Sequence, residues 1–382
     1  MDFSFNENDI INSYKYLHSI PEPEFQEFKT SDYIKNFLYD IGLKPVACAN
    51  TGVYADIAGS GETDEIFLIR ADIDALPLDE KSGVDFSSAH SGYMHACGHD
   101  MHTACLLYAA KALVDNREAF KGTVRVLFQP AEEGSGGALP MIKEGAADGV
   151  TAAIAMHADP LELVGTVSYL DGSITASPDD FKLIIKGRGG HGAEPENCIN
   201  PLKAAARIID AYSAVKDDFF SDDDCVVSVC TVHGGSFNNI IPDSVEITGT
   251  ARSFDSNIRS LLKDKLKEIA FKTQKELGVS IEFIYNELYP PTVCDRDINS
   301  VVIEACRKTE EIKKLVKLSR GSLTGDDFSY FAELCPSSYY RFGVAGDGER
   351  FPLHSPYFRI DTSALLPACK IFVYAAIEYL NR

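Results

Sequence analysis

The sequence predicts a two-domain protein in which a smaller α+β domain interrupts an α/β domain with a mostly parallel sheet flanked by helices. At 382 residues the chain exceeds what one hydrophobic core usually supports. Helical and extended segments alternate in its first half and again after Pro290-Pro291. Between these two regions, the predicted helices and strands no longer alternate one by one. We therefore expect residues 1–177 and 290–382 to form one domain and residues 178–289 the other.

In the first half, the spacing of apolar residues switches between helical periodicity and short apolar runs. Helical spacing predicts helices over residues 30–43 and 102–114. Short apolar runs predict strands near residues 66–69, 122–128 and 152–156. This alternation is typical of a parallel sheet covered by helices.

The middle of the chain follows a different order. A strand is expected over residues 181–186 and a long amphipathic helix over residues 200–215. The segments that follow are strands at 226–232 and 245–251, a helix at about 257–277 and a strand at 279–285. The resulting order β-α-β-β-α-β is that of a ferredoxin-like unit.

Composition and charge narrow the possible partners and location. The net charge is −21, which argues against nucleic acid or an anionic membrane as a partner. The N-terminal sequence MDFSFNENDI lacks the features of a secretory signal, and we expect no stretch long and apolar enough to span a membrane. Ten cysteines without framework spacing favour reduced thiols and a cytoplasmic location.

One segment of eight residues, His95 to His102, combines a thiol with several imidazoles. Such side chains are ligands for zinc or a similar divalent ion. Cys97 and His99 lie two positions apart and cannot share one face of a helix, so we expect them in a loop that enters the helix after them. The alternative is a helix N-terminus whose polar groups are all hydrogen-bonded.

Further candidate ligands stand in three other short segments. Glu132 and Glu133 come after the strand at 122–128, where ligand-binding residues of open α/β sheets lie. One carboxylate could bind metal while its neighbour moves a proton, although a solvated turn is the commoner reading of an acidic pair. His157 and His354 stand in short polar segments, and a single histidine of this kind is more often structural.

Taken together, these segments resemble the metal-dependent aminoacylase-like amidohydrolases, which include hippurate hydrolase, plant auxin-conjugate hydrolases and N-acetyldiaminopimelate deacetylase. The resemblance extends almost from end to end. Its segments are PEPEFQEFKTSDYI, RADIDALP, HACGHDMHTA, QPAEEG, MHADP, GRGGHGAEP, NNIIPDSVEITGTARSFD, GDDFSYF and LHSP. It implies a zinc-exopeptidase-like catalytic domain with an inserted lid and dimerisation domain.

The resemblance also implies roles for individual residues. Glu132 would be the general base that takes a proton from the metal-bound water and passes it to the leaving nitrogen. Asp74 would orient a metal ligand. Two divalent ions (zinc, manganese, cobalt or nickel) would share five ligands, with Cys97 or a water bridging them: Cys97, His99, Glu133, His157 and His354.

The resemblance assigns three residues of the inserted domain to the substrate. His191 would hydrogen-bond the developing oxyanion, from its own or the partner subunit. Asn239 and Arg252 would meet the substrate carboxylate. For Arg252 the alternative is a strand residue paired with a surface acid.

The chain departs from the family pattern at a few positions. Glu196 and Asn200 replace a histidine and an aspartate, and Asp326-Asp327 and Asp361-Thr362 replace other acidic pairs. Asp72 stands where the related peptidase branch has a histidine, and we expect it to be structural. These departures concern the substrate pocket. Three single histidines that belong to no motif, His18, His90 and His233, are expected to be structural or on the surface.

The function expected from these residues is hydrolysis of N-acyl-L-amino acids to a carboxylate and a free amino acid. The small-molecule substrate would be the main partner, with a homodimer or larger oligomer formed through the lid domain. One alternative is a metallopeptidase of carboxypeptidase or dipeptidase type that uses the same dinuclear site. A second is a silent binding protein on the same fold, which would have no physical reason to keep Glu132 beside the metal.

Overall fold

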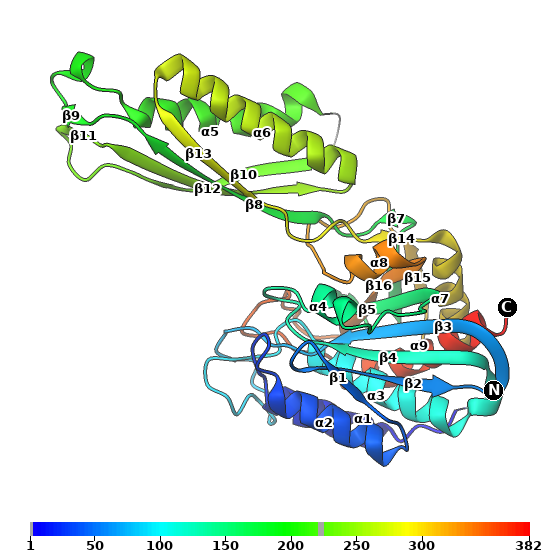
Figure 1. Ribbon diagram of the computed structural model, residues 1–382. Helices are drawn as coiled ribbons and strands as arrows, with labels where there is room; N and C mark the ends of the chain where they lie inside the picture. The colour runs from blue at the N-terminus through cyan, green and yellow to red at the C-terminus, as the bar shows by residue number, and fades with distance from the viewer. Residues whose placement is uncertain (1–2, 221–224) are drawn as a thin grey trace. The chain divides into compact units, whose positions relative to one another are not determined.

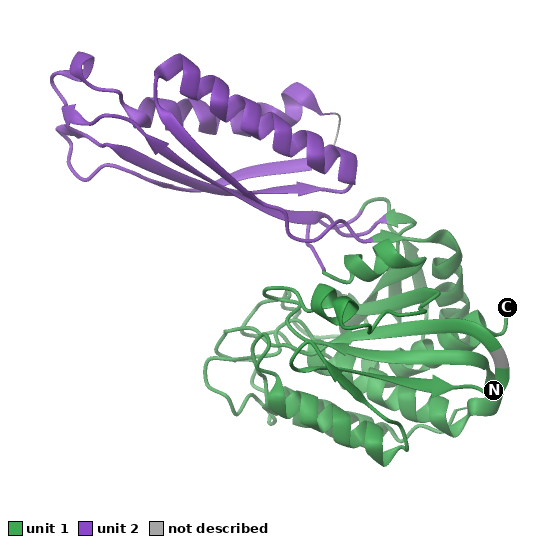
Figure 2. Ribbon diagram, in the orientation of Figure 1, with its two compact units in different colours: residues 1–172, 293–320, 327–382 green, residues 173–292, 321–326 purple. Residues whose placement is uncertain are grey.

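The computed structural model describes residues 3–220 and 225–382, and the chain divides into two compact units (Figure 2). Unit 1 comprises Met1–Gly172, Val293–Arg320 and Asp327–Arg382. Unit 2 comprises Ser173–Thr292 and Gly321–Asp326. The sequence-based boundaries are 177/178 and 289/290, and they do not include the short return of the chain at 321–326. This return belongs to unit 2 because Ser322 forms a β-bridge with Thr175.

Unit 1 is built on an eight-stranded sheet with the order β1-β2-β4-β3-β5-β16-β6-β15 (Figure 1). The neighbours β4, β3, β5 and β16 run parallel, and antiparallel pairs join β1, β2 and β6 to them. The expectation of a mostly parallel sheet flanked by helices is therefore confirmed. The strands are β1 (Val46–Cys48), β2 (Gly52–Ala58), β3 (Gly61–Asp72), β4 (Lys121–Gln129), β5 (Ala152–Leu163), β6 (Thr166–Tyr169), β15 (Lys314–Lys317) and β16 (Ser337–Ala345).

The helices of unit 1 pack against this sheet and one another, with α3 in contact with α1 and α9. The second helix begins at Phe28 rather than near Thr30, because the carboxylate of Glu22 accepts hydrogen bonds from the N–H groups of Lys29 and Thr30. The helices are α1 (Glu7–Ser19), α2 (Phe28–Asp40), α3 (His99–Asp115), α4 (Ala138–Lys143), α7 (Arg296–Lys308), α8 (Ser329–Leu334) and α9 (Leu365–Leu380).

The last helix corrects one expectation from the sequence. Thr362–Leu380 is a 19-residue helical segment with a mean hydropathy of 1.4, which is long and apolar enough to cross a membrane by length and composition. The expectation that no stretch approaches this length was therefore wrong. Within this segment, 61% of the most apolar 18-residue window is buried in the structure. Helix α9 supplies core residues such as Ile371 and Phe372.

Unit 2 has the order β8-α5-β10-β12-α6-β13, which is the β-α-β-β-α-β order expected of a ferredoxin-like unit. Its sheet has the order β10-β12-β8-β13 with every pair antiparallel, and α5 and α6 pack on one face of it (Figure 1). The elements are β8 (Ser177–Lys186), α5 (Pro201–Phe219), β10 (Cys225–His233), β12 (Ser244–Ser253), α6 (Ser256–Leu277) and β13 (Ser280–Asn286). Two short two-stranded sheets accompany the larger ones: β9 (Gly190–His191) pairs with β11 (Ile240–Ile241), and β7 (Gly172–Ser173) pairs with β14 (Val293–Cys294).

A buried carboxylate ties together one end of unit 2. Asp179 on β8 is 1% exposed. Its oxygens accept two hydrogen bonds from the guanidinium of Arg259 on α6, at 2.6 and 2.9 Å. They also accept from the hydroxyl of Tyr285 at 2.9 Å and the backbone N–H of Leu288 at 3.2 Å. A forked pair of this kind joins helix and sheet with fixed geometry.

Replacing this carboxylate should destabilise unit 2 strongly. Asp179→Asn leaves the Arg259 guanidinium without a negative partner, and breaking a buried pair from one side costs about 3 kcal/mol or more. The measurement is urea unfolding of the full chain, followed by hydrogen exchange in peptides of β8 and β12. The matched control is Lys182→Ala, which breaks the exposed pair with Glu246 and should cost less than about 1 kcal/mol. Equal losses in the two variants would contradict the role given to Asp179.

Candidate metal centre

Three neighbouring parallel strands bring polar residues to one edge of the unit 1 sheet. Asp72 ends β3 and Asp74 follows two residues later, while Glu132 and Glu133 follow β4. His157 lies within β5. Because β3 pairs in parallel with both β4 and β5, the carboxyl ends of β3 and β4 lie beside the middle of β5, where His157 stands. This edge is where open α/β sheets bind ligands.

Two turns add the remaining side chains. His99 is the first residue of α3, and Gly98 before it has a φ of 87°. A Cβ at Gly98 would also lie only 3.0 Å from the Cβ of Ala158, so glycine is required for the turn that presents Cys97. His354 has a φ of 62°, and its N–H donates to the carbonyl of Ala96 at 2.9 Å.

The five ligands expected from the sequence lie together in unit 1. Cys97, His99 and His157 form one group of three whose ligand atoms lie within 4.8 Å of one another. Cys97 also forms a second such group with Glu133 and His354. The two groups share the thiol of Cys97, so the ligand sets of two adjacent cation sites are next to each other. Glu132 lies beside them, in a group with His99 and Glu133.

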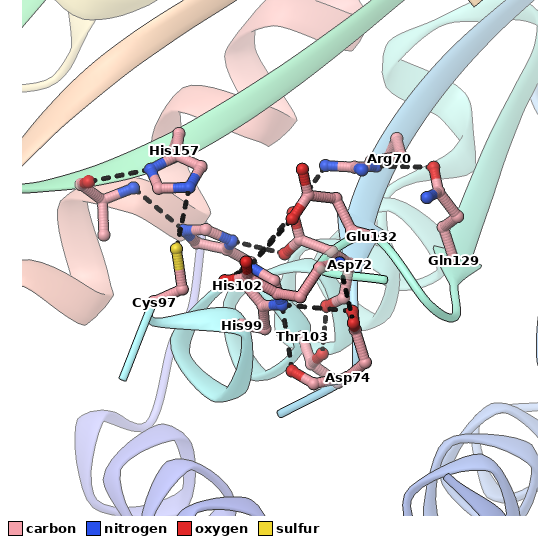
Figure 3. A network of polar contacts seen from close by, with 12 residues as sticks. Arg70, Asp72, Asp74, Cys97, His99, His102, Thr103, Gln129, Glu132 and His157 are labelled. Carbon is pink, nitrogen blue, oxygen red and sulfur yellow. Dashed lines mark hydrogen bonds and ion pairs between the residues drawn. The ribbon is translucent and has the colours of Figure 1, made fainter. Parts of the chain in front are cut away.

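The imidazoles are oriented by their second nitrogens (Figure 3). Nδ1 of His99 lies 3.0 Å from the carbonyl oxygen of Asp74 and 3.3 Å from its Oδ1. Nδ1 of His157 donates to the carbonyl of Ala158 at 2.9 Å, and its Nε2 lies 3.4 Å from the sulfur of Cys97. Hydrogen bonds of this kind fix the tautomer so that Nε2 is the atom available to a metal.

The residues fit a divalent cation on their own chemistry. Nε2 of His99 is buried and has no hydrogen-bond partner among the described residues. Its nearest acidic oxygens, on Asp72, Glu132 and Glu133, are 3.7 to 3.9 Å away, beyond hydrogen-bond distance. A buried polar atom without a partner is costly, and a cation between the imidazole and the carboxylates would satisfy it.

The pKa values of the proposed ligands also fit a bound divalent cation. Burial opposes a charged imidazole at His99, but Asp72, Asp74 and Glu133 outweigh it and raise its pKa to about 10. Burial and the nearby Glu133 raise the pKa of the Cys97 thiol well above its ordinary value. The shift at His99 reflects the surrounding negative charge, whereas burial is the main cause at Cys97. A bound divalent cation would reverse the shift of a coordinating thiol. Burial and His102 lower the pKa of His157 to about 3, so its imidazole is neutral, as a ligand must be.

Asp72 is held in a separate network behind the ligands. It is fully buried and accepts from Nη1 of Arg70 at 2.5 Å and Nδ1 of His102 at 2.6 Å. Nε2 of His102 in turn accepts the N–H of Ala158 at 2.9 Å. Both nitrogens of His102 are therefore occupied. The arrangement agrees with the structural role expected for Asp72.

Sequence reasoning missed the cation of this network. Arg70 is 1% exposed, and its guanidinium also contacts Gln129 at 3.0 Å and Asp327 at 3.1 Å. A signal existed, because an arginine inside the apolar strand FLIRAD can be buried only if acidic or amide oxygens surround it. The partner 257 residues away could not be identified from that signal.

His18 and His90 make structural contacts, in agreement with the role expected for them. Nδ1 of His18 lies 2.6 Å from Asp100, and its Nε2 lies 3.1 Å from Glu80. Burial opposes the charge on His18, but the hydrogen bonds to Asp100 and Glu80 raise its pKa to about 9. Nδ1 of His90 lies 2.9 Å from the carbonyl of Pro21. These contacts link distant segments, which a single sequence does not reveal.

The residues expected to meet the substrate lie in unit 2 at two separate places. His191 on β9 pairs with Ile240 on β11, and Gly192 donates its N–H to the carbonyl of Asn239. Arg252 lies near the other end of the sheet, opposite Pro178 on β8. From Ser244 to Arg252, β12 makes eight strand steps of about 3.3 Å each, which is roughly 26 Å. The structure groups His191 with Asn239 and separates both from Arg252.

The site's chemistry agrees with comparisons to known proteins. Residues 68–378 match the model of peptidase family M20/M25/M40. The chain is 38% identical to an N-acetyl-L-cysteine deacetylase of Bacillus subtilis, over 100% of this chain and 90% of that one. It is 33% identical to thermostable carboxypeptidase 1 of Saccharolobus solfataricus, over 98% and 96% of the two chains.

A solved structure extends the comparison to the fold and the metals. A Bacillus subtilis protein described as a dinuclear metal-binding peptidase from the M20 family superposes with a TM-score of 0.87 at 33% identity, covering 98% of each chain. The resemblance found in the sequence and the parallel-sheet fold are thereby confirmed. The chain belongs to peptidase family M20/M25/M40, and it is a metal-dependent amidohydrolase.

Proposed function

We propose that the protein hydrolyses the amide bond of N-acyl-L-amino acids and releases a carboxylate and a free amino acid. The observation that carries this proposal is the pair Glu132-Glu133 beside two ligand groups that share Cys97. One carboxylate of the pair belongs to a Cys97 group, and the other is left to handle protons. A relative named N-acetyl-L-cysteine deacetylase supports the same substrate class.

The proposed ligands would hold two divalent ions, and Cys97 belongs to both groups of ligands. A donor set of imidazoles, a carboxylate and one thiolate suits zinc, manganese, cobalt and nickel. When bound, such ions polarise the scissile carbonyl and acidify the attacking water. The five proposed ligands are Cys97, His99, Glu133, His157 and His354.

Glu132 is the proposed general base. It is 6% exposed, and its Oε2 lies 3.9 Å from Nε2 of His99, so it is next to the ligands. In this role it takes the proton of the attacking water and delivers it to the leaving nitrogen. Asp74 would act through His99, whose Nδ1 it holds. That contact keeps Nε2 directed towards the metals.

In unit 2, we assign oxyanion stabilisation to His191 and binding of the substrate carboxylate to Asn239 and Arg252. A small substrate cannot reach both ends of a strand about 26 Å long. We therefore infer a homodimer in which His191 and Asn239 of one copy serve a different active site from its Arg252. The edge strand β10, with Val232 45% exposed, is a surface on which a second copy could pair.

The alternative substrate is a peptide, because one relative is named a thermostable carboxypeptidase. A panel of acetyl-, benzoyl- and indoleacetyl-amino acids beside dipeptides, assayed with each metal added back, separates the two. Faster turnover of dipeptides would replace the proposed substrate class. We also propose a cytoplasmic location, with which the ten free cysteines agree.

Replacing the general base should abolish turnover while leaving the metals in place. Glu132→Gln removes the proton acceptor, and general-base catalysis contributes about 10² to 10⁴ in rate. The checks are kcat on an N-acyl amino acid and metal content by mass spectrometry. The matched control is Glu133→Gln, which should lose metal. If Glu132→Gln loses metal and Glu133→Gln keeps it, the two roles are exchanged.

Metal should protect Cys97 from thiol reagents, because coordination occupies the sulfur lone pair. We expect modification of Cys97, followed by peptide mass spectrometry, to be faster after chelation than in the metal-loaded protein. Cys230 is exposed on β10 and should react equally in both states, which makes it the internal control. A Cys97→Ala variant with two metals bound and full activity would refute the assignment.

The carboxylate-binding role of Arg252 predicts a specific pattern of losses. Blocking the substrate carboxylate as an amide should cost about 10- to 150-fold in kcat/KM, as expected for a charge-assisted hydrogen bond. Arg252→Ala should impose a similar loss on the free acid and little further loss on the amide. The measurement is the two-by-two comparison of kcat/KM. Equal cleavage of acid and amide by the wild type would contradict recognition of the substrate carboxylate by Arg252.

A further inference from the structure

The loop that carries Glu132 and Glu133 leaves β4 in an unusual conformation. Ala131 is fully buried and has a φ of 58°, a left-handed conformation that costs energy for any residue with a Cβ. The loop closes at Gly136, whose N–H donates to the carbonyl of Ala131 at 3.0 Å. Strain of this kind persists only when surrounding contacts hold it.

Three carboxylates hold alternate backbone N–H groups of this loop. The N–H of Ala131 donates to Oε1 of Glu27 at 2.9 Å. The N–H of Glu133 donates to Oδ2 of Asp74 at 2.9 Å. The N–H of Ser135 donates to Oε2 of Glu24 at 2.6 Å, and its hydroxyl donates to the same oxygen at 2.7 Å. The loop is therefore attached before, between and after its two glutamates.

Two of these carboxylates come from the segment before α2, about a hundred residues away in sequence. Glu27 is fully buried, and its second oxygen accepts from the hydroxyl of Thr51 at 2.5 Å. Glu24 lies so close to the loop that a Cβ at Gly134 would be 2.0 Å from its Oε2. Glu27 is therefore held by Thr51 as well as by the loop, and Glu24 lies directly against the loop.

We propose that Glu24 and Glu27 are positioning residues that clamp the loop and so aim Glu132 and Glu133 at the metal centre. The inference rests on the proposed roles of these two glutamates. Several carboxylates meet at this edge, and their mutual repulsion would push the loop outward whenever the cations leave. The hydrogen bonds from the N–H groups of Ala131 and Ser135 to these carboxyl oxygens fix the loop at both of its ends. They resist that displacement without adding a side chain to the site.

The same segment offers a matched control. Glu22 is also buried, at 6% exposure, and its carboxylate accepts from the N–H groups of Lys29 and Thr30 at the start of α2. No described contact joins its side chain to residues 131–136. Glu22→Ala therefore removes a buried glutamate from the same segment and leaves the attachments of the loop intact.

The experiment compares Glu27→Ala, Glu27→Gln, Glu24→Ala and Glu22→Ala in the metal-loaded full chain. Three readouts are kcat and KM at saturating metal, metal affinity by chelator competition, and hydrogen exchange of the 131–136 peptide. Misplacing a catalytic group by about 1 Å can cost about 100-fold. We expect Glu27→Ala to lower kcat about 10- to 100-fold with little change in KM.

The other readouts follow from the geometry. Loss of a contact that orients a ligand weakens metal binding about 10- to 100-fold, and the freed N–H groups should exchange faster. Burial raises the pKa of Glu27 to about 7, and a neutral carboxyl still accepts at its carbonyl oxygen. Glu27→Gln should therefore retain most of the activity. Glu22→Ala should lower the Tm and leave kcat and the exchange of the loop unchanged.

Several results would overturn the clamp. It is wrong if Glu27→Ala and Glu24→Ala keep wild-type kcat, metal affinity and loop exchange, or if Glu22→Ala lowers kcat as much as they do. Glu24 is exposed, so Glu24→Ala tests the clamp even if Glu27→Ala does not fold. Full turnover in Glu132→Gln would refute the proposed function instead, while metal affinity and loop exchange would still decide on the clamp.

Discussion

Unit 1 depends on how it balances the negative charge gathered at the carboxyl ends of β3 and β4. Carboxylates this deeply buried are stable only when cations or several hydrogen bonds surround them. Arg70 supplies the fixed cation, with its guanidinium at 2.5 Å from Asp72 and 3.1 Å from Asp327. Glu132 and Glu133 lie beside His99, with carboxylate oxygens 3.9 Å from its Nε2, and in this part of the cluster the residues fit divalent ions.

Two neighbouring acidic residues, Asp72 and Asp74, have different partners and therefore different structural roles. Asp72 is fully used by Arg70 and His102, and it fixes the β5 backbone at Ala158 through His102. Asp74 instead spans the site, with one oxygen near His99 and the other accepting the N–H of Glu133. One carboxylate thus orders the strands behind the ligands. The next contacts two of the proposed ligands, His99 and Glu133.

Much of this arrangement could be predicted from the sequence, because it depends on local order. The alternation of elements, the β-α-β-β-α-β insertion and the strand-end acids are periodic or adjacent in the chain. What could not be predicted depends on partners far apart in sequence. The contacts of Arg70 with Asp327 and of His18 with Asp100 join residues 257 and 82 positions apart. The wrong expectation for α2 has the same origin, since its first turn is capped by a glutamate outside the helix.

Unit 2 holds the residues proposed to meet the substrate at two separate places. Arg252 lies one register position from Ala251, which faces the buried Asp179 and its fork from Arg259, so this end of the sheet is held by helix, strand and loop together. His191 and Asn239 lie at the other end, on the two-residue strand pair β9 and β11 and its connection. The sheet keeps the two ends apart, so under the proposed roles a substrate that contacts both would receive them from two copies of the chain. Such a requirement would make catalysis dependent on assembly, because a single copy can present only one of the two ends to any one small substrate.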